Sequence, residues 1–318
     1  MINYENFNLE NEIRKINETE YSNENYFNWY SHKKIICQLY NLRPSKYLSA
    51  RVYHSMYITD YEITKKAQKI KIPVLCARKS QVDYLLKKGR SKNQTFATGG
   101  LFPMYRRFKN IQQIENPKGT FAFPVHSSKR CQVQMAYDDY IKKLKELPEE
   151  FQPVDVCLHW CDIEIGVHKI FLENGIKVYT TGHCNDEDFC DNFYEILRHY
   201  KYATSNYTVN SSLFYAIEMG LNVFLYGIEN EPIFDIIDKS NKKAVKFRLD
   251  TAKIQYDFCK ERLPVYPNTK ITDEAKDSII NIMGLDWQSP KEKVRRALLR
   301  QEWKNRLKNV FDVIFRKN

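Results

Sequence analysis

A repeated alternation between residues 121 and 227 constrains the fold more than any other feature of the chain. Short apolar runs, each followed by a polar loop, alternate there with segments of helical periodicity. The expected strands are 121–125, 154–160, 177–181, 202–205 and 222–226, and the expected helices are 136–147, 163–174, 188–200 and 211–219, with Asp162 as a cap. Such alternation predicts a parallel, doubly wound α/β domain. The strands are apolar on both sides, which is typical of a sheet covered by helices on both faces.

The rest of the chain is less regular. Residues 47–53 and 72–76 are expected strands and residues 80–88 an expected helix, which is compatible with a second α/β domain. The boundary is placed near residues 110–118, and a last helix is expected over 290–315. The predicted organisation is an N-terminal domain 1–112, a Rossmann-like domain 113–288 and a basic amphipathic C-terminal helix within 289–318.

Charge is concentrated at the C-terminal end. The net charge is +11, and the segment from Ser289 onward contains ten Lys or Arg against three Asp or Glu. A basic tail on a nearly neutral body favours an anionic membrane surface over nucleic acid, for which no binding motif is present. We expect a cytoplasmic protein, because residues 1–20 lack a secretory signal and no apolar run is long enough to span a membrane. The eight cysteines are then expected to be free thiols.

Candidate site residues follow the expected strands, because open parallel sheets bind ligands at the carboxyl ends of their strands. The set contains two histidines, three serines, an amide and two cations. It comprises His126, Ser127, Ser128, Lys129, Arg130, Trp160, Cys161, Asp162, Gly182, His183, Ser205, Asn206 and Gly227, and Tyr226, which precedes Gly227, is added to the candidates. These groups suit a phosphate-bearing ligand. The alternative is ordinary loop chemistry, since Ser, Asn and Gly are common in turns.

The segment 205–212 is the sharpest single feature. It joins an expected strand to the next helix, and Asn210, Ser211 or Ser212 could supply the N-cap. The free backbone N–H groups of that helix start would attract an anion such as a diphosphate. A plain cap without a ligand is the alternative.

Several common sites are excluded by what the sequence lacks. It contains neither a P-loop nor a strand-linked G-x-G-x-x-G, which argues against a P-loop enzyme and a dinucleotide dehydrogenase. No G-x-S-x-G elbow supports a serine hydrolase. Cys157, His159 and Cys161 would share one strand face without the usual zinc spacing, so no metal is expected. His183 could be a general acid or base, a phosphate contact or a satisfied loop residue.

Longer stretches of sequence resemble a known family. They are Phe-Pro-Val-His-Ser-Ser (123–128), Cys-Leu-His-Trp-Cys-Asp-Ile-Glu (157–164), Val-Tyr-Thr-Thr-Gly-His (178–183), Tyr-Ala-Thr-Ser-Asn (202–206) and the run 213–227, with 72–89 as a counterpart. Over roughly residues 25–230 the chain resembles GT-B-type glycosyltransferase-like proteins of bacterial surface-polysaccharide (capsule or lipopolysaccharide) biosynthesis. Two departures are the lack of a glycine in 209–212 and the acids Glu229 and Glu231.

The resemblance implies two Rossmann-like domains facing a cleft, with the nucleotide-sugar in the C-terminal domain and the acceptor in the N-terminal one. It implies transfer to a surface-polysaccharide or lipid-linked acceptor, without a metal or a cofactor beyond the donor. His183 and His126 would be catalytic, the strand-end residues would hold the phosphates, and Glu218 would bind a ribose hydroxyl. His54, Asp60 and Glu62 are base candidates by residue type only.

Two alternatives remain open within the resemblance, a non-catalytic scaffold or sugar-binding protein and a nucleotide-sugar epimerase. The C-terminal helix is expected to cross onto the N-terminal domain, to contact the inner membrane peripherally, or both.

Overall fold

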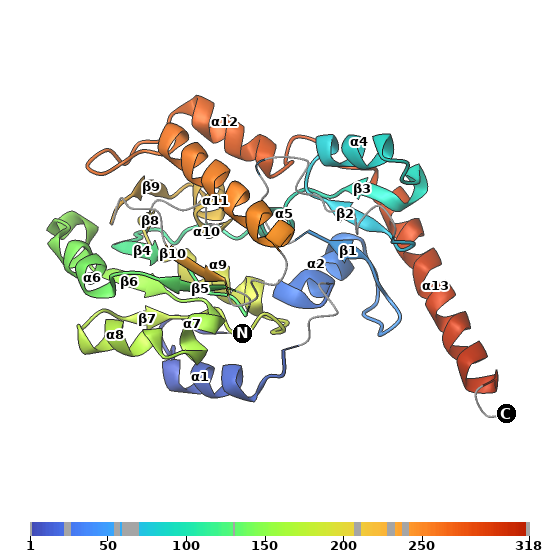
Figure 1. Cartoon of the computed structure of the whole chain (residues 1–318), viewed down its shortest axis with the longest axis horizontal. Coiled ribbons are helices and arrows are strands. Elements are labelled where there is room, and N and C mark those ends of the chain that lie inside the picture. The colour runs from blue at the N-terminus through green and yellow to red at the C-terminus, as the bar shows by residue number, and fades with distance from the viewer. Residues whose placement is uncertain are drawn as a thin grey trace. The chain divides into compact units, whose positions relative to one another are not determined.

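The computed structural model describes residues 2–21, 27–53, 58, 70–129, 131–206, 211–227, 233–236 and 242–315. The chain divides into two compact units (Figure 1). Unit 1 contains residues 1–21 and 111–278, and unit 2 contains residues 22–110 and 279–318. Neither unit is a single continuous segment, whereas the sequence analysis expected consecutive domains. The division after Asn110 lies at the expected boundary region, and the N-terminal residues join the later unit.

Unit 1 is built on a parallel sheet. Its strands are β4 (Thr120–Phe123), β6 (Val154–Cys157), β7 (Val178–Tyr179), β8 (Tyr202–Ser205) and β9 (Asn222–Leu225). They pair in parallel in the order β7-β6-β4-β8-β9 (Figure 1). The α/β class with a doubly wound parallel sheet is therefore confirmed. β8 has the expected bounds, and the other four strands are shorter than the expected apolar runs, because pairing ends before the loops that follow them.

Most of the helices of unit 1 lie between these strands in the chain, while the first precedes them and the last follows them. They are α1 (Leu9–Glu18), α6 (Tyr137–Glu146), α7 (Trp160–Glu164), α8 (Val167–Glu173), α9 (Phe189–Leu197), α10 (Ser211–Met219) and α11 (Lys242–Arg262), with the short η4 (Glu149–Phe151). α12 (Asp273–Ile282) runs across the division into unit 2. Tyr137 of α6 contacts Phe171 of α8 edge to face, and Phe193 of α9 contacts Tyr215 of α10 in the same way. The helices therefore form two pairs, as right-handed crossovers on either side of β4 require.

A second, small sheet in unit 1 was not expected from sequence. β5 (Cys131–Gln134) pairs antiparallel with β10 (Ile233–Ile236), with Val133 opposite Phe234. β5 directly follows the polar loop after β4. The pairing therefore anchors the far end of that loop.

Aromatic residues fill the core beneath the central strand. Phe121 of β4 is fully buried and stacks on Tyr200 at 4.6 Å between ring centroids. Phe123, two residues on, contacts Phe121 edge to face and reaches Phe193 of α9. Close-packed aromatic contacts of this kind fix the central strand between its helices.

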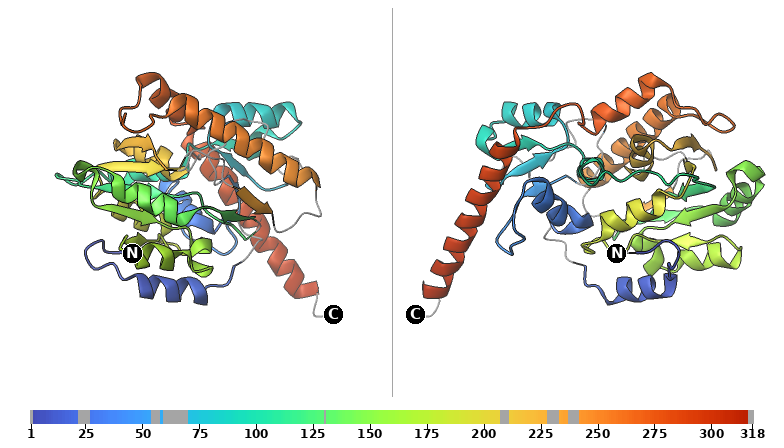
Figure 2. Two further views of the ribbon diagram at one scale, coloured as in Figure 1. Left: turned by 60° about the vertical axis from the view of Figure 1, so that its left-hand side comes forward. Right: turned by 180° about the vertical axis from the view of Figure 1, so that it is seen from behind.

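Unit 2 has a smaller parallel sheet in the order β1-β2-β3. Its elements are β1 (Arg51–Val52), β2 (Val74–Cys76), β3 (Thr95–Ala97), α2 (His32–Leu39), α4 (Lys79–Lys87), α5 (Leu101–Lys109) and α13 (Lys291–Phe315), with η1 (Trp29–Ser31) and η3 (Lys92–Gln94). The expected strand 47–53 is reduced to two paired residues. Figure 2 shows the C-terminal half of α13 extending past the other elements of unit 2. Among the described helices, none combines the length and apolar character needed to cross a bilayer.

Candidate functional site

The strand order of unit 1 reverses between β4 and β8, which lie side by side at the centre of the sheet. Two crossovers that leave in opposite directions separate at this point, and open parallel sheets bind ligands there, outside the carboxyl ends of the strands. Asn206, directly after β8, is buried and its Oδ1 accepts a hydrogen bond from the Val125 N–H at 2.8 Å. Its Nδ2 lies 3.0 Å from the Met135 sulfur. Asn206 thus ties the loop after β8 to the loop after β4.

The loop after β4 is held by Ser127. This residue is buried, its N–H donates to Asp162 Oδ1 at 3.0 Å, and its Oγ accepts from the Val133 N–H at 3.1 Å. Burial raises the pKa of Asp162, while His126 and the Ser127 hydrogen bonds act in the opposite direction. Ser127 therefore connects its loop to α7 and β5, and its backbone and hydroxyl both have protein partners.

The neighbouring candidates face outward. Ser128 is exposed, and the Lys129 ammonium pairs with Glu164 Oε2 at 2.6 Å. The same ammonium lies 5.1 Å above the Trp160 ring. The expectation that Asp162 caps the following helix is wrong. His159 is the N-cap, with Nδ1 accepting from the Cys161 N–H at 3.4 Å, and α7 begins at Trp160. Asp162 sits in the first turn and reaches Ser127 instead.

A row of aromatic and imidazole rings crosses the carboxyl edge of the sheet. His183 follows β7, His159 and Trp160 follow β6, and His126 follows β4. The His126 and His159 rings stack at 4.2 Å, those of His159 and Trp160 are 5.4 Å apart, and those of Trp160 and His183 are 4.3 Å apart. Tyr21 packs against Trp160 at 5.4 Å. The sequence analysis considered His159 only as a metal ligand, and its place at a strand end was the signal that could have included it.

His183 is the buried end of this row, with 3% of its surface exposed. Its Nδ1 accepts a hydrogen bond from the Asn185 N–H at 3.1 Å, so the proton of the neutral ring is on Nε2. Nε2 is buried and has no hydrogen-bond partner among the described residues, and the same holds for Nε1 of Trp160 beside it. Burial lowers the pKa of His183, with Glu164 raising it and Lys129 lowering it. The ring is thus a neutral hydrogen-bond donor at pH 7.

Two buried, unpartnered donors at one place require an explanation. A buried donor without an acceptor costs about 1–3 kcal/mol, so such groups are rare in native proteins. Nε2 of His183 and Nε1 of Trp160 lie near the carboxyl edge but are shielded from solvent, so a ligand oxygen could accept from them only if the side chains around them moved. Other buried side-chain atoms of unit 1, such as the hydroxyls of Tyr137 and Tyr140, also lack a hydrogen-bond partner among the described residues.

The start of α10 contains Ser211 and Ser212, both half-buried, and Ser211 hydrogen-bonds Tyr215 one turn on. Asn210 and Arg130 lie outside the described residues. Glu218 is seven residues beyond Ser211, or roughly 10 Å along the helix. Because α10 runs back from the carboxyl edge, Glu218 does not lie with the other candidates.

The last strand ends at Tyr226 and Gly227. Ser205 is fully buried, and its carbonyl accepts from the Tyr226 N–H at 3.1 Å. The Tyr226 ring packs on Tyr266 at 5.0 Å, and its pKa is raised by burial and by Glu146 and Tyr266. Gly227 has φ of +135°, and a Cβ there would lie 2.7 Å from the Tyr140 ring and 3.2 Å from Asn206 Cβ. Gly227 is therefore needed for close packing around Asn206.

Metal ligation has no support within the described residues. No group of three or more His, Cys, Asp or Glu side chains there lies close enough to hold an ion. Burial raises the pKa of Cys157 and of Cys184 to about 12, so both are thiols rather than thiolates at neutral pH. Every cysteine whose side chain is described is a free thiol.

Comparison with known proteins gives little. Neither a scan against protein-family models nor a search of curated proteins finds a match. Among solved structures, Anabaena HepE in complex with UDP-glucose is similar at 9% identity and a TM-score of 0.28, covering 82% of this chain and 71% of that chain. HepE with UDP and glucose gives 10% identity and 0.29, covering 80% and 69%. TM-scores this low assign neither a fold nor a ligand to this chain.

Proposed function

We propose that the protein is a glycosyltransferase that moves a sugar from a nucleotide-activated donor to a saccharide or lipid-linked acceptor. The observation that carries the proposal is the carboxyl edge of the unit 1 sheet. The strand order reverses there between β4 and β8, and Asn206 joins the loops that follow these two strands. His183, at the β7 end of the same edge, has a buried Nε2 without a partner among the described residues. Nucleotides bind doubly wound sheets at this edge.

The chemistry follows from where charge develops. Transfer forms a bond from an acceptor hydroxyl oxygen to the anomeric carbon and breaks the bond between that carbon and the phosphate oxygen. The acceptor hydroxyl loses its proton, and negative charge grows on the departing diphosphate. In the proposal, the backbone N–H groups at the start of α10 and the Nε2–H of His183 donate to oxygens of the nucleotide-sugar at different points along the carboxyl edge. Lys129 adds a cation when it leaves Glu164. These protein groups neutralise the negative charge of the departing diphosphate, and Ser127 positions the loop after β4. Unit 2 binds the acceptor, a surface polysaccharide precursor.

A thermal-shift screen tests donor binding. The purified protein is heated with UDP, GDP, CDP, CMP or dTDP, with and without magnesium. A nucleotide at 100 times its Kd stabilises the folded state by about 2.7 kcal/mol, which for a unit of this size corresponds to a rise in Tm of roughly 5–10 °C. Failure of every nucleotide at millimolar concentration would overturn the proposal and favour the non-catalytic scaffold. Interconversion of a nucleotide-sugar without acceptor would favour the epimerase.

His183→Phe tests the proposed donor while keeping a ring of similar size against Trp160. We expect about 10²–10³-fold lower kcat, the usual cost of losing one such donor. His168→Phe is the matched control, because His168 is also buried and also has a pKa lowered by burial, but lies on α8 away from the edge. Equal losses of activity in both variants would assign the effect to folding rather than to the site.

The proposal includes peripheral contact with an anionic membrane through α13. Trp303, Leu307, Val310 and Phe311 are each more than half exposed and recur at helical spacing on one face. The opposite face is fixed to unit 2, where Asn305 Nδ2 donates to the Tyr47 carbonyl at 2.7 Å. The ten Lys and Arg residues from Ser289 onward complement anionic lipid. An apolar stripe within a basic helix is typical of helices that lie in the membrane interface.

Vesicle flotation tests this contact. We expect the protein to float with vesicles of phosphatidylglycerol and phosphatidylcholine, and much less with phosphatidylcholine alone. Leu307→Ser with Phe311→Ser should abolish flotation. The control is Ile165→Ser with Leu172→Ser, which removes two exposed apolar side chains from unit 1. If both double variants float like the wild type, α13 is not the contact.

A further inference from the structure

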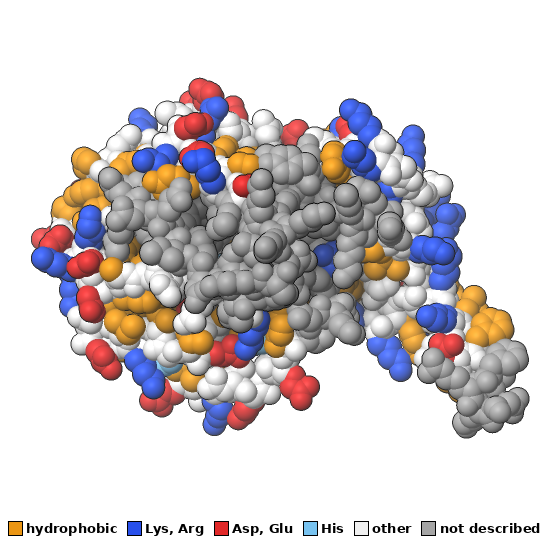
Figure 3. Space-filling view, in the orientation of Figure 1, with side chains coloured by type: hydrophobic (Ala, Val, Ile, Leu, Met, Phe, Trp, Pro, Cys, Tyr) orange, Lys and Arg blue, Asp and Glu red, His pale blue; other side chains and the backbone are white. Residues whose placement is uncertain are grey.

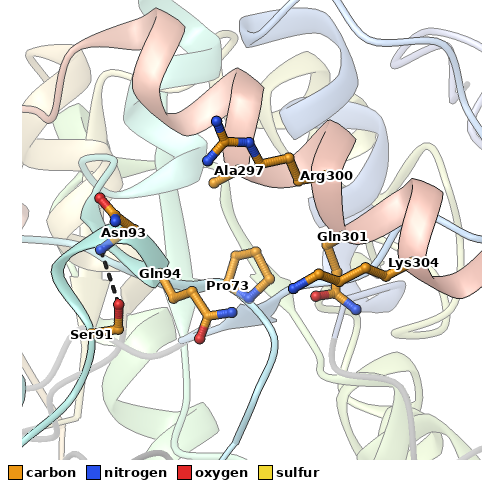
Figure 4. Close-up of a pocket in the computed structure, with 8 residues that line it drawn as sticks. All are labelled: Pro73, Ser91, Asn93, Gln94, Ala297, Arg300, Gln301 and Lys304. Atoms are coloured by element: carbon orange, nitrogen blue, oxygen red, sulfur yellow. Dashed lines mark hydrogen bonds between the residues drawn. The ribbon is translucent and has the colours of Figure 1, made fainter.

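A basic groove in unit 2 shares four cations with the basic segment already described, Lys293, Arg296, Arg300 and Lys304. A cavity of about 680 Å³ lies between α4, β3 and the start of α13, and a second of about 310 Å³ lies beside η3 and further along α13. Asn93, Ala297 and Arg300 line both, so the two form one elongated groove, called here the α13 groove. Both cavity volumes are within the range of about 300–1,000 Å³ that is typical of small-ligand sites. Figure 4 shows the smaller part, with Lys304 reaching from α13 toward Pro73.

Unpaired positive charge lines this groove. The cations are Lys92, Lys293, Arg296, Arg300 and Lys304, together with Lys79. Lys79 is neutralised by Asp83 on its own helix, at 2.5 Å. Within the described part of the chain, no carboxylate pairs with Lys92, Lys293 or Arg300. Figure 3 shows Lys and Arg side chains along the α13 edge. Clustered like charges in a cleft raise the local concentration of anions.

Neutral groups in the groove narrow the class of anion. Hydroxyl and amide side chains lie among the cations, namely those of Ser91, Asn93, Gln94, Thr95 and Ser289. Gln94 and Thr95 already donate to backbone carbonyls, whereas within the described residues the hydroxyls of Ser91 and Ser289 only accept from backbone N–H groups and keep their proton for a ligand. Such groups both donate and accept hydrogen bonds, as sugar hydroxyls require. Trp287 lines the larger part with 41% of its surface exposed. An exposed indole ring packs against apolar ring faces, and a bare phosphate would use neither the ring nor the length of the groove.

We propose that the α13 groove binds a segment of acidic saccharide, a chain of sugar rings that carries carboxylate, phosphate or sulfate groups. The cations pair with the acidic groups, the amides and hydroxyls bond the ring hydroxyls, and Trp287 packs on a ring face. The site is confined to unit 2 and does not depend on nucleotide binding in unit 1. The proposal for the α13 groove and the proposal that unit 1 binds a nucleotide can therefore be refuted independently of each other.

Tryptophan fluorescence provides the test. Trp29 and Trp160 are buried, so in a Trp303→Phe background the exposed indole is that of Trp287. Titration with a galacturonate hexasaccharide at about 50 mM salt should give a saturable change. Arg296→Gln with Arg300→Gln should weaken binding at least tenfold. Lys270→Gln with Lys276→Gln, which removes two exposed charges from unit 1, should change it less than twofold.

Two further variants separate charge from packing. Arg296→Lys with Arg300→Lys keeps both charges and should retain most of the affinity. Trp287→Ala, followed by calorimetry, should weaken binding by roughly threefold to tenfold. The proposal is overturned if maltohexaose, which is uncharged, binds as tightly as the acidic probe. It is also overturned if the protein with Arg296→Gln and Arg300→Gln binds the acidic probe as tightly as the wild type does. If pyrophosphate binds as tightly as the acidic hexasaccharide or more tightly, the groove is a simple anion site. If an oligothymidylate does so, the groove binds nucleic acid instead.

Discussion

Asn206→Ala is the sharpest test of how the site is held. Asn206 is 4% exposed, and its Oδ1 is the acceptor for the buried Val125 N–H at 2.8 Å. Alanine removes this acceptor and leaves the N–H group at the end of β4 without a partner. It also opens a small void beside Tyr140 and Gly227, which both pack around this position.

The cost can be worked from these contacts. An unsatisfied buried donor costs about 1–3 kcal/mol, and a void of a few atoms adds about 1 kcal/mol. We therefore expect unit 1 to lose about 2–4 kcal/mol of unfolding free energy. For a unit of this size that corresponds to a fall in Tm of roughly 4–16 °C. Because the loops after β4 and β8 would separate, nucleotide binding should weaken as well.

Equilibrium urea unfolding, followed by far-UV circular dichroism, measures this loss, and unchanged m-values would show that the denatured state is the same. Asn174→Ala is the control, since the Asn174 side chain makes one hydrogen bond to the backbone, donated to the Ile170 carbonyl at 3.0 Å, but is partly exposed. It should cost less than about 1 kcal/mol. If Asn206→Ala costs no more than the control, Asn206 does not hold the two loops together.

Two other predictions concern unit 1. Burial lowers the pKa of His183 below its ordinary 6.5, so at pH values just below 6.5 the imidazole is protonated in the unfolded chain but not in the folded one. The unfolding free energy of the wild type should therefore fall relative to that of His183→Gln as the pH drops below about 6.5. Urea unfolding between pH 7.5 and 5.5 checks this, and parallel curves would contradict it. Gly119→Ala should cost more than 2 kcal/mol in calorimetry, because φ is +68° and a Cβ would lie 2.4 Å from the Pro153 carbonyl oxygen. Gly175→Ala, at φ +74° with open space, should cost only about 1–2 kcal/mol, and equal losses would refute the clash.

Local sequence signals predicted the elements of the unit 1 sheet. The helix expected at 211–219 is α10 with the same bounds, because serines begin it and Gly220 ends it. The strand expected at 154–160 ends at Cys157 instead. The reason is that His159 caps a helix, and histidine is not among the usual N-cap residues.

Pairings between distant segments were beyond local signals. β5 and β10 are about 100 residues apart, and neither has a pattern that names the other. The joining of residues 279–318 to residues 22–110 in unit 2 is also a matter of packing between remote segments. Hydrophobic periodicity shows that a segment has a buried face, but not which partner buries it.

The candidate site was predicted in outline and not in detail. The strand-end rule selected His126, His183 and Asn206, which the structure places along one edge. It could not show that Ser127 bonds Asp162 and Val133, because hydrogen-bond partners are decided by tertiary packing. The unpartnered Nε2 of His183 was equally invisible, since it depends on the Asn185 N–H fixing the tautomer.

Asp155 and Tyr200 form a buried polar pair in the core of unit 1. The Tyr200 hydroxyl donates to Asp155 Oδ2 at 2.5 Å, and Asp155 is 6% exposed. Burial raises the pKa of Asp155, while the Tyr200 hydrogen bond and Lys177 lower it. Burial and the charge of Asp155 raise the pKa of the Tyr200 hydroxyl, which therefore remains a donor. The hydrogen bond thus favours the charged form of a carboxyl that burial penalises.

Tyr200→Phe keeps the ring that stacks on Phe121 and removes the hydroxyl, which donates to Asp155 and also interacts with Tyr4 and Tyr179. Hydrogen bonds to charged groups contribute about 1.5–3 kcal/mol, so we expect a loss of that size in urea unfolding at neutral pH. Because the bond lowers the pKa of Asp155, its contribution is present at high pH and fades as the pH falls and the carboxyl is protonated. On an Asp155→Asn background the same substitution should cost less than about 1 kcal/mol. Equal costs on both backgrounds would mean that the hydroxyl stabilises the core without acting on the charge.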